Sequence, residues 1–331
     1  MIGGTPQEIG EIRMILKQLT GGEEPDLRPL GGGVSCLVFL ASTSRGMWVV
    51  KKALPKLMVR DEWVADRGRI FRETGCLRVI RELVDRDAAP EVILEDRIRY
   101  ACVLEYGDGG VTWKELLMRG VIDPSVTVRV ASILVRLHQK TRGVERLAAE
   151  FGDDTNFVQL RIDPYITHVA GKHLDIAAKL THVAELLRRC KVCLVHGDYS
   201  PKNILLLPDG RIWILDCEPA HFGNPVFDIA FCTNHLILKS IHLRSAAHLE
   251  EGQRLWRIYW NEAGWDNAME WEEEAVKVLA TLLLARVDGK SPVEYLSEDN
   301  RGMVRRLSKK LIADSVDDFG ELIIRVKEVI S

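Results

Sequence analysis

The densest polar stretch of the chain is VHGDYSPKNIL at residues 195–205, and WILDCE follows it at residues 213–218. Asn203 comes five residues after Asp198, and Asp216 comes thirteen residues after Asn203. Short apolar runs flank both segments and predict strands, so a rigid sheet can present these side chains at a cleft. The pattern therefore predicts a polar site built on strand ends in the second half of the chain.

The chemistry of these three side chains suits phosphoryl transfer. A carboxylate beside a substrate hydroxyl can accept its proton. An amide oxygen and a second carboxylate can hold Mg²⁺, which prefers oxygen ligands and bridges phosphates. The protein then contributes mainly positioning and charge neutralisation. The alternative is a hydrogen-bonded turn, because Asp and Asn are common turn residues. The length of the string, with Asp216 at its spacing, disfavours that alternative.

The string HGDYSPKN at residues 196–203, followed by ILDCEPAHFGNPVFDIA at residues 214–230, resembles the aminoglycoside phosphotransferase and choline kinase superfamily. The resemblance extends from about residue 28 to about residue 240. It implies an α+β, bilobal, protein-kinase-like fold, with a small antiparallel-sheet lobe before a larger, mainly helical lobe. It also implies ATP and Mg²⁺ as cofactors and a small molecule with a hydroxyl group as acceptor. The segment HFGNPVFDI at residues 221–229 is similar to the methylthioribose kinase branch, which points to a sugar or sugar-like alcohol.

The resemblance implies a role for each polar residue of the second half. Asp198 matches the catalytic aspartate that orients or deprotonates the acceptor hydroxyl. Asn203 and Asp216 match metal ligands, and Glu218 is a further metal residue whose contact with the ion is either direct or indirect. His196 matches a mainly structural histidine, and Asp228 matches an aspartate that braces the catalytic loop.

The remaining matches lie in the first 110 residues and concern the nucleotide. Lys51 matches the phosphate-binding lysine at a strand end. Its neighbour Lys52 is the alternative candidate for this role, and strand alternation places the two side chains on opposite faces. Glu73 matches the glutamate that pairs with that lysine, the alternative being a solvated helix charge. The other matched positions are the glycine-rich loop with Gly32, Gly33 and Ser35, for which a plain hairpin turn is the alternative, and the adenine-binding segment with Glu105 and Gly107.

Hydrophobic patterning agrees with two unlike halves. Helices are predicted at residues 7–20 and 61–86 and strands at 37–40, 47–50, 92–94 and 100–104, which together make a small antiparallel sheet with a helix. Beyond residue 110 the pattern is mostly helical, interrupted by short strands at 192–195, 204–207 and 212–215. Asp123 and Pro124 form a helix start. With the break GDGG at residues 107–110, we predict an N-terminal nucleotide-binding lobe at 1–105 and a catalytic and acceptor-binding lobe at 106–331, with a hinge at 105–110.

Composition excludes several classes of protein. The 331 residues are 47% hydrophobic and 28% charged, which excludes intrinsic disorder. A net charge of −3 lacks the basic excess of a nucleic-acid binder. The longest apolar runs fall short of the roughly 20 residues of a membrane span, and the N-terminus does not fit a signal peptide. An odd number of scattered cysteines, seven, indicates reduced thiols and a cytoplasmic protein.

The acceptor is not identified by the sequence. Candidate acceptor residues are Arg161, Asp163 and Tyr165 and the segment around Asn234 and His235. The acidic run at 262–274 is either a steering patch for a polycation or a solvated helix face. The segment 285–292 either borders the acceptor or is a helix end. ATP versus GTP and the oligomeric state stay open, and the alternative function is a nucleotide-binding pseudokinase or regulatory scaffold without turnover.

Overall fold

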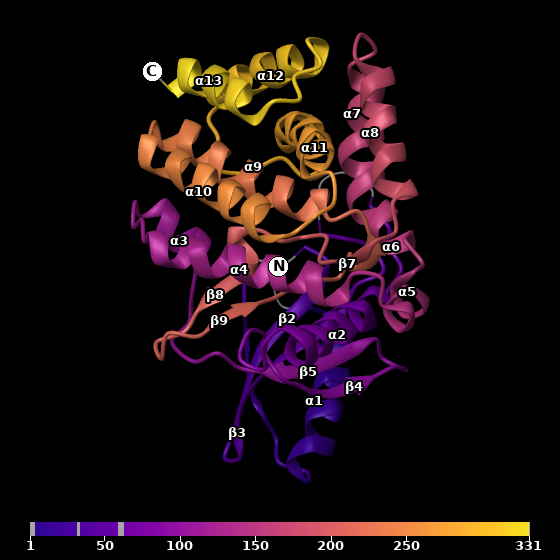
Figure 1. The fold of residues 1–331 in the computed structure, drawn as a ribbon. Coiled ribbons are helices and arrows are strands. Elements are labelled where there is room, and N and C mark those ends of the chain that lie inside the picture. Colours follow the sequence, from indigo (N-terminus) through magenta and orange to yellow (C-terminus); the bar gives the residue numbers. More distant parts are fainter. Residues whose placement is uncertain (1–3, 32–33, 59–62, 331) are drawn as a thin grey trace.

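A five-stranded antiparallel sheet forms the N-terminal part of the computed structural model, which describes residues 4–31, 34–58 and 63–330 (Figure 1). The strand order is β1-β2-β3-β5-β4. The long hairpin of β2 and β3 pairs Val38 with Lys51, and β3 pairs Lys51 with Cys102 of β5. The strands are β1 (Asp26–Pro29), β2 (Cys36–Thr43), β3 (Gly46–Ala53), β4 (Val92–Asp96) and β5 (Ala101–Glu105).

The two faces of this sheet are covered by different helices. Helix α1 (Pro6–Thr20) begins at a capping box in which Thr5 and Glu8 bond to each other's backbone, and it buries Ile12, Ile15 and Leu16 against one face. Helix α2 (Arg69–Val79), which continues as a π-helix (Ile80–Val84), packs in the main core on the other face. Each face therefore packs against its own helix, and the buried side chains at the end of β3 point alternately into two separate cores.

The C-terminal part is mainly helical (Figure 1). Helix α9 (Val226–Leu243) is buried along almost its whole length. Helices α10 (Ala246–Glu262) and α11 (Ala268–Asp288) pack against α9, and α4 (Pro124–Thr141) packs against α10. The other helices are α3 (Trp113–Met118), α5 (Glu145–Phe151), α6 (Thr155–Phe157), a π-helix (Val158–Thr167), α7 (His168–Lys172), α8 (Ala177–Arg189), a 3-10 turn (Pro201–Asn203), α12 (Glu298–Ala313) and α13 (Phe319–Ile330).

Short strands carry the polar segments at residues 195–205 and 213–218. β7 (Cys193–Val195) pairs with β10 (His221–Gly223), and β8 (Ile204–Leu206) pairs with β9 (Ile212–Ile214) and with β6 (Val111–Thr112). The two loops between these strands therefore lie together, one holding residues 196–203 and the other residues 215–220. This arrangement places the residues of both loops at one edge of the helical part.

The α+β fold class predicted from the sequence is confirmed, as are the helix at 7–20 and the helix start at Asp123 and Pro124. The predicted helix at 61–86 is wrong in its first part, because α2 begins only at Arg69 and residues 63–68 are extended or turn. The guanidinium of Arg69 bonds to the carbonyl oxygens of Ala65 and Asp66, which holds this segment outside the helix. The boundary at 105–110 stays a prediction: β5 ends at Glu105, and β6 already pairs with β8.

No helix within the described ranges combines the length and the apolar content that crossing a membrane requires.

Candidate active site

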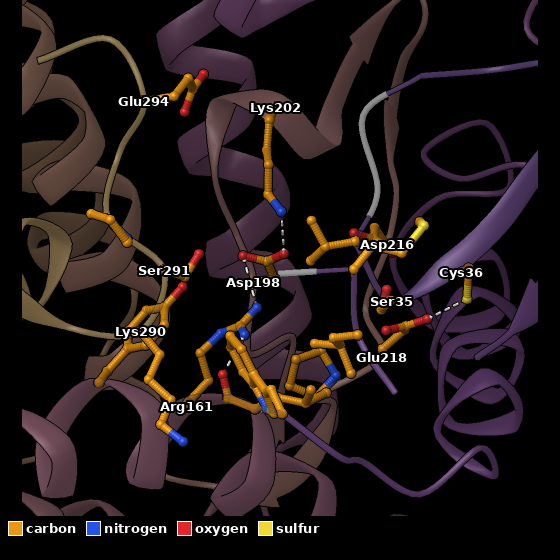
Figure 2. A pocket seen from close by; sticks show the side chains of 18 of the residues that line it. Ser35, Cys36, Arg161, Asp198, Lys202, Asp216, Glu218, Lys290, Ser291 and Glu294 are labelled. Atoms are coloured by element: carbon orange, nitrogen blue, oxygen red, sulfur yellow. Dashed lines mark hydrogen bonds and ion pairs between the residues drawn. The ribbon is translucent and has the colours of Figure 1, made fainter. Parts of the chain in front are cut away.

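A cavity of about 790 Å³ opens between the N-terminal sheet and the helical part, and Figure 2 shows its polar wall. Four predicted site residues line it: Ser35, Asp198, Asp216 and Glu218. Asp198 lies in the middle of the view, between Asp216 and Glu218 on one side and Lys290 and Ser291 on the other. The cavity therefore has two regions that meet at Asp198.

Lys51 is the centre of a buried charge cluster beside the cavity. Its Nζ lies 2.7 Å from both carboxylate oxygens of Glu73 and 2.7 Å from Oδ1 of Asp216. Burial alone would lower the pKa of Lys51, but Asp216 and Glu73 outweigh it and raise that pKa well above its ordinary value. Burial raises the pKa of Glu73 to about 7, against the opposing effect of Lys51. The predicted lysine, glutamate and second aspartate are thus brought together.

Lys52 lies on the opposite face of β3, as strand alternation predicts. Its Nζ is 2.7 Å from the carbonyl oxygen of Arg99 and 2.7 Å from a carboxylate oxygen of Glu11 on α1. Lys52 therefore makes its contacts away from the cluster of Lys51.

Asp216 follows β9 in the left-handed region, with a φ of 60°. A residue other than glycine in this region is strained by about 1–3 kcal/mol and persists where its surroundings hold it. The Lys51 ion pair is such a restraint. Burial would raise the pKa of Asp216, but the charges of Lys51 and Lys202 hold it far below its ordinary value, so this carboxyl is ionised.

Three carboxylates provide the group of oxygens best suited to a cation. Oxygens of Glu73, Asp216 and Glu218 lie within 4.8 Å of one another, and such hard oxygen donors suit Mg²⁺. Glu218 is also tied to the protein, because it accepts from Nε of Arg69 at 3.2 Å and from the thiol of Cys36 at 2.9 Å. The donor set therefore fits the implied magnesium ion, and Arg69 and Cys36 hold Glu218 in position.

Asn203, the other predicted metal residue, lies against Asp198. Its amide nitrogen donates to the backbone oxygen of Asp198 at 3.0 Å and to the carboxylate at 2.8 Å. With the amide so oriented, the side-chain oxygen of Asn203 is left as an acceptor. The structure thus links Asn203 to Asp198 more directly than to the three carboxylates.

Asp198 is held by two cations. The guanidinium of Arg161, on the π-helix, lies 2.9 Å from Oδ1, and Nζ of Lys202 lies 2.9 Å from Oδ2 (Figure 2). Arg161 also donates to the carbonyl oxygen of Gly197 at 2.7 Å, which ties the loop to the helical part. Two cations and an amide bind this carboxylate and fix its direction.

His196 and Asp228 support this loop from below. Both oxygens of Asp228 accept backbone N–H bonds, from His196 at 2.7 Å and from Gly197 at 2.9 Å. Nδ1 of His196 accepts from the backbone nitrogen of Asp198 at 3.1 Å, so Nε2 carries the proton toward the carbonyl oxygen of Leu215. Burial lowers the pKa of His196, so the imidazole is neutral and engaged at both nitrogens. These contacts suit a structural role for both residues.

The predicted nucleotide-binding positions are only partly brought together. Gly32 and Gly33 lie outside the described residues. The backbone oxygen of Ser35 accepts from Arg69 at 2.6 Å beside the cavity. Glu105 and Gly107 are not among the described residues that line the cavity. Gly107 is packed so closely that a Cβ atom would lie 2.8–2.9 Å from side chains of the β8–β9 hairpin.

Sequence reasoning missed three cations of the site: Arg69, Lys202 and Arg286. Lys202 stands inside the catalytic-loop string, four residues after Asp198, so its spacing was a usable signal. Arg69 has no such signal, because its partner Glu218 is 149 residues away. Arg286 lies two residues before the end of α11, in the segment 285–292 that had two interpretations. The helix end is confirmed, because α11 ends at Asp288. That the segment borders the acceptor stays a prediction, although Lys290 to Pro292 line the cavity.

Comparison with solved structures shows proteins of the same kinase-like fold. A choline/ethanolamine kinase family protein from Mesorhizobium loti is 18% identical, with a TM-score of 0.53 over 97% of this chain and 99% of that chain. Plasmodium vivax ethanolamine kinase is 14% identical, with a TM-score of 0.55 over 88% and 83%. The ADP-bound aminoglycoside phosphotransferase APH(2'')-Ib is 18% identical, with a TM-score of 0.50 over 97% and 96%.

The sequence model of the phosphotransferase enzyme family matches residues 26–271, and the chain belongs to this family. This match confirms the resemblance found in the motifs. A comparison with curated protein sequences finds no match. The class that the sequence match defines is therefore that of the phosphotransferase enzymes.

Proposed function

We propose that this protein is an ATP- and Mg²⁺-dependent kinase that transfers the γ-phosphate to a hydroxyl group of a small molecule. The observation that carries the proposal is the position of Asp198 where the two regions of one cavity meet, with the Lys51 cluster toward one region. We further propose that the nucleotide-binding part ends at residues 105–110. The neighbour with bound ADP supports nucleotide binding in this fold.

Each residue has a distinct part in the proposed reaction. Lys51 binds phosphate oxygens, and its ion pair with Glu73 sets the position of its ammonium group. Asp216 and Asn203 would hold Mg²⁺, and Glu218 would be the further metal residue. The ion neutralises phosphate charge when it is bound. Asp198 orients the acceptor hydroxyl and accepts its proton.

Lys202 adds a function that the sequence analysis did not assign. Its ammonium group is 2.9 Å from Asp198, so it lies next to the atoms between which the phosphoryl group would move. A cation at this point stabilises negative charge on the transferring group. It also helps to hold the Asp198 carboxylate in position beside the acceptor hydroxyl.

A cytoplasmic location is part of the proposal. All seven cysteines are free thiols, and six of them are buried. Thiols of this kind persist in a reducing compartment.

The test is a titration of ATP with and without Mg²⁺, followed by ADP release over a panel of acceptors. The panel contains aminoglycosides, methylthioribose, choline, ethanolamine, homoserine and fructosamines. We expect Mg²⁺-dependent ATP binding and ADP release with at least one acceptor. Nucleotide binding without turnover on any acceptor would instead favour the pseudokinase alternative.

Asp216→Asn tests the metal assignment. We expect it to weaken binding of Mg²⁺–ATP by about tenfold or more, since a charged ligand to the ion is lost. Asp209→Asn, at an exposed turn with 52% of its side chain accessible, is the matched control and should bind like the parent. Equal Mg²⁺–ATP affinities for the Asp216 variant and the parent would remove Asp216 from the metal site.

A further inference from the structure

The cavity region on the far side of Asp198 from Asp216 is lined mainly by cations. In Figure 2, Lys290 and Ser291 lie across Asp198 from Asp216, and Glu294 lies above them. The wall there comes from α3, the π-helix at 158–167, the loop at 196–203, α9, and the end of α11 with the segment after it. Its cations are Lys114, Arg161, Lys202, Arg286 and Lys290, and its carboxylates are Asp198 and Glu294.

These charges do not balance within the cavity wall. Asp198 is shared by Arg161 and Lys202, and Glu294 is paired with Lys114. Counted over the whole cavity, the lining has five cations and four carboxylates, because Asp216 and Glu218 line it too. Among the cations of this region, Arg286 has no ion pair with a carboxylate of the described residues. A ligand in this region therefore meets a positive potential, focused by the low-dielectric walls of the cavity.

Arg286 is the most informative of these cations. It is only 8% exposed, and the partners of its guanidinium are the hydroxyl of Tyr165 at 2.8 Å and the oxygens of Ser291. No carboxylate partner of Arg286 is present among the described residues, and its Nε is buried without a hydrogen-bond partner. A buried guanidinium is normally paired with an anion, because an uncompensated charge is costly. Arg286 therefore points to an anion that the chain itself does not supply.

The neighbouring histidine responds to the same field. His235 lines the cavity, is 6% exposed and has no partner at Nε2 within the described residues. Burial, together with the charges of Arg286, Lys239 and Lys202, lowers its pKa well below the ordinary value. His235 is thus neutral and adds no charge to the wall.

The aromatic rings of this region are already covered by cations. The guanidinium of Arg161 lies 5.5 Å from the ring centres of Tyr165 and Phe231, and that of Arg286 lies 5.5 Å from Tyr165. An ammonium ligand binds to acidic groups or to open aromatic faces. This region offers neither in excess, so it is poorly suited to an amino alcohol or a polycation.

We propose that the acceptor carries an anionic group, a carboxylate or a phosphate ester, in addition to the hydroxyl that is phosphorylated. Arg286 and Lys290 bind the anionic group, and the hydroxyl lies at Asp198. The γ-phosphate is a separate ligand on the side of Lys51 and Asp216, with Arg161 and Lys202 between the two. This inference rests on the proposed function, because it concerns the acceptor of the same reaction.

The experiment compares acceptors that share a carbon skeleton and differ in charge. ADP release at saturating Mg²⁺–ATP is measured with glycerol, glycerate and glycerol 3-phosphate, and with ribose, ribonate and ribose 5-phosphate. Ethanolamine, choline and an aminoglycoside represent cations. We expect kcat/KM for an anionic member to exceed that of its neutral analogue by about tenfold or more. The carboxylate and phosphate arms show which anion the site takes.

Two variants locate the effect. Arg286→Gln should lower kcat/KM for the preferred anionic acceptor by about tenfold and leave the KM for ATP unchanged within about twofold. Lys290→Gln, at a partly exposed position, should do the same to a smaller extent and keeps the test valid if the Arg286 variant does not fold. Lys310→Gln removes the same charge from the exposed face of α12 and should have no effect.

The outcomes separate this inference from the proposed function. If neutral or cationic acceptors are phosphorylated in preference to anionic ones, the inference is wrong and the kinase assignment stands. If no compound is phosphorylated and Mg²⁺–ATP does not bind, both are wrong. An anionic preference that Arg286→Gln and Lys290→Gln leave intact would also overturn the inference.

Discussion

The Lys51 cluster allows a prediction in which stability and pH are coupled. Lys51→Met removes the only cation that contacts both Glu73 and Asp216 within the described residues. Removing one partner of a buried ion pair typically costs about 3–5 kcal/mol. Because 29% of the Asp216 side chain is exposed to water, which offsets part of the loss, we expect about 3 kcal/mol near pH 8.

The cost should depend on pH through Glu73. Lys51 lowers the pKa of this buried carboxyl, so its loss raises a pKa that is already about 7. The folded variant then keeps a proton that the unfolded chain releases above the ordinary value of 4.5. A state that binds more protons is favoured at low pH, so the variant loses about 1.4 kcal/mol per pH unit as pH rises between these two pKa values. Its stability therefore recovers as pH falls.

Urea unfolding at pH 6 and pH 8 measures this effect. The control is Lys52→Met, which removes the same charge from the opposite face of β3, where the partner carboxyl of Glu11 has a lowered pKa. The stability that the control loses relative to the parent should be the same at pH 6 and at pH 8. The reasoning is refuted if Lys51→Met is as stable as the parent at pH 8, or if its loss is the same at both pH values.

Two further substitutions test the packing around the site. Arg69→Met should lower the free energy of unfolding in urea by about 3–5 kcal/mol, because removal of the fully buried guanidinium leaves the carboxylate of Glu218 and several carbonyl oxygens unsatisfied. Arg306→Met, at an exposed position, should lower it by less than about 0.5 kcal/mol. Gly107→Ala should cost about 1–3 kcal/mol by overpacking against the β8–β9 hairpin, whereas Gly171→Ala, with open space around it in α7, should be neutral or slightly stabilising.

Equal stabilities within either pair would contradict the packing argument for that position. If Arg306→Met loses as much stability as Arg69→Met, the loss is caused by removal of a positive charge and not by removal of the buried contacts.

The Lys51 cluster could be predicted from the sequence because short-range rules suffice for it. Strand alternation separates Lys51 from Lys52, and a strand followed by a helix can bring a lysine and a glutamate 22 residues apart onto facing surfaces. Asp216 follows from the motif. For these residues the local pattern and the tertiary contact agree.

The contacts of Arg69 could not be predicted in the same way. In the sequence it is one arginine among several charged residues at the start of a helical pattern. Its burial depends on the loop of Ser35, the end of β3 and the segment of Glu218 meeting at one point. The same contacts explain why the predicted helix began too early, since Arg69 captures carbonyl oxygens of the preceding residues.

The cationic acceptor wall was hidden for a different reason. The whole chain has a net charge of −3, and its most visible charge run, at 262–274, is acidic. The cations of the wall come from separate elements, including Lys114 on α3 and Arg286 on α11. Only the fold gathers them around one cavity, so the sequence alone could not predict this cationic wall.

Transfer of label from [γ-³²P]ATP to an acceptor hydroxyl, compared between the parent and Asp198→Asn, tests the central claim most directly. The parent should label the acceptor in the presence of Mg²⁺. In the variant, an amide of the same shape as the carboxylate lies beside Arg161 and Lys202 but cannot accept the proton. Its kcat should therefore fall by a factor of about 10²–10⁴ while ATP still binds. Labelling of the acceptor at the parental rate by Asp198→Asn would contradict the account.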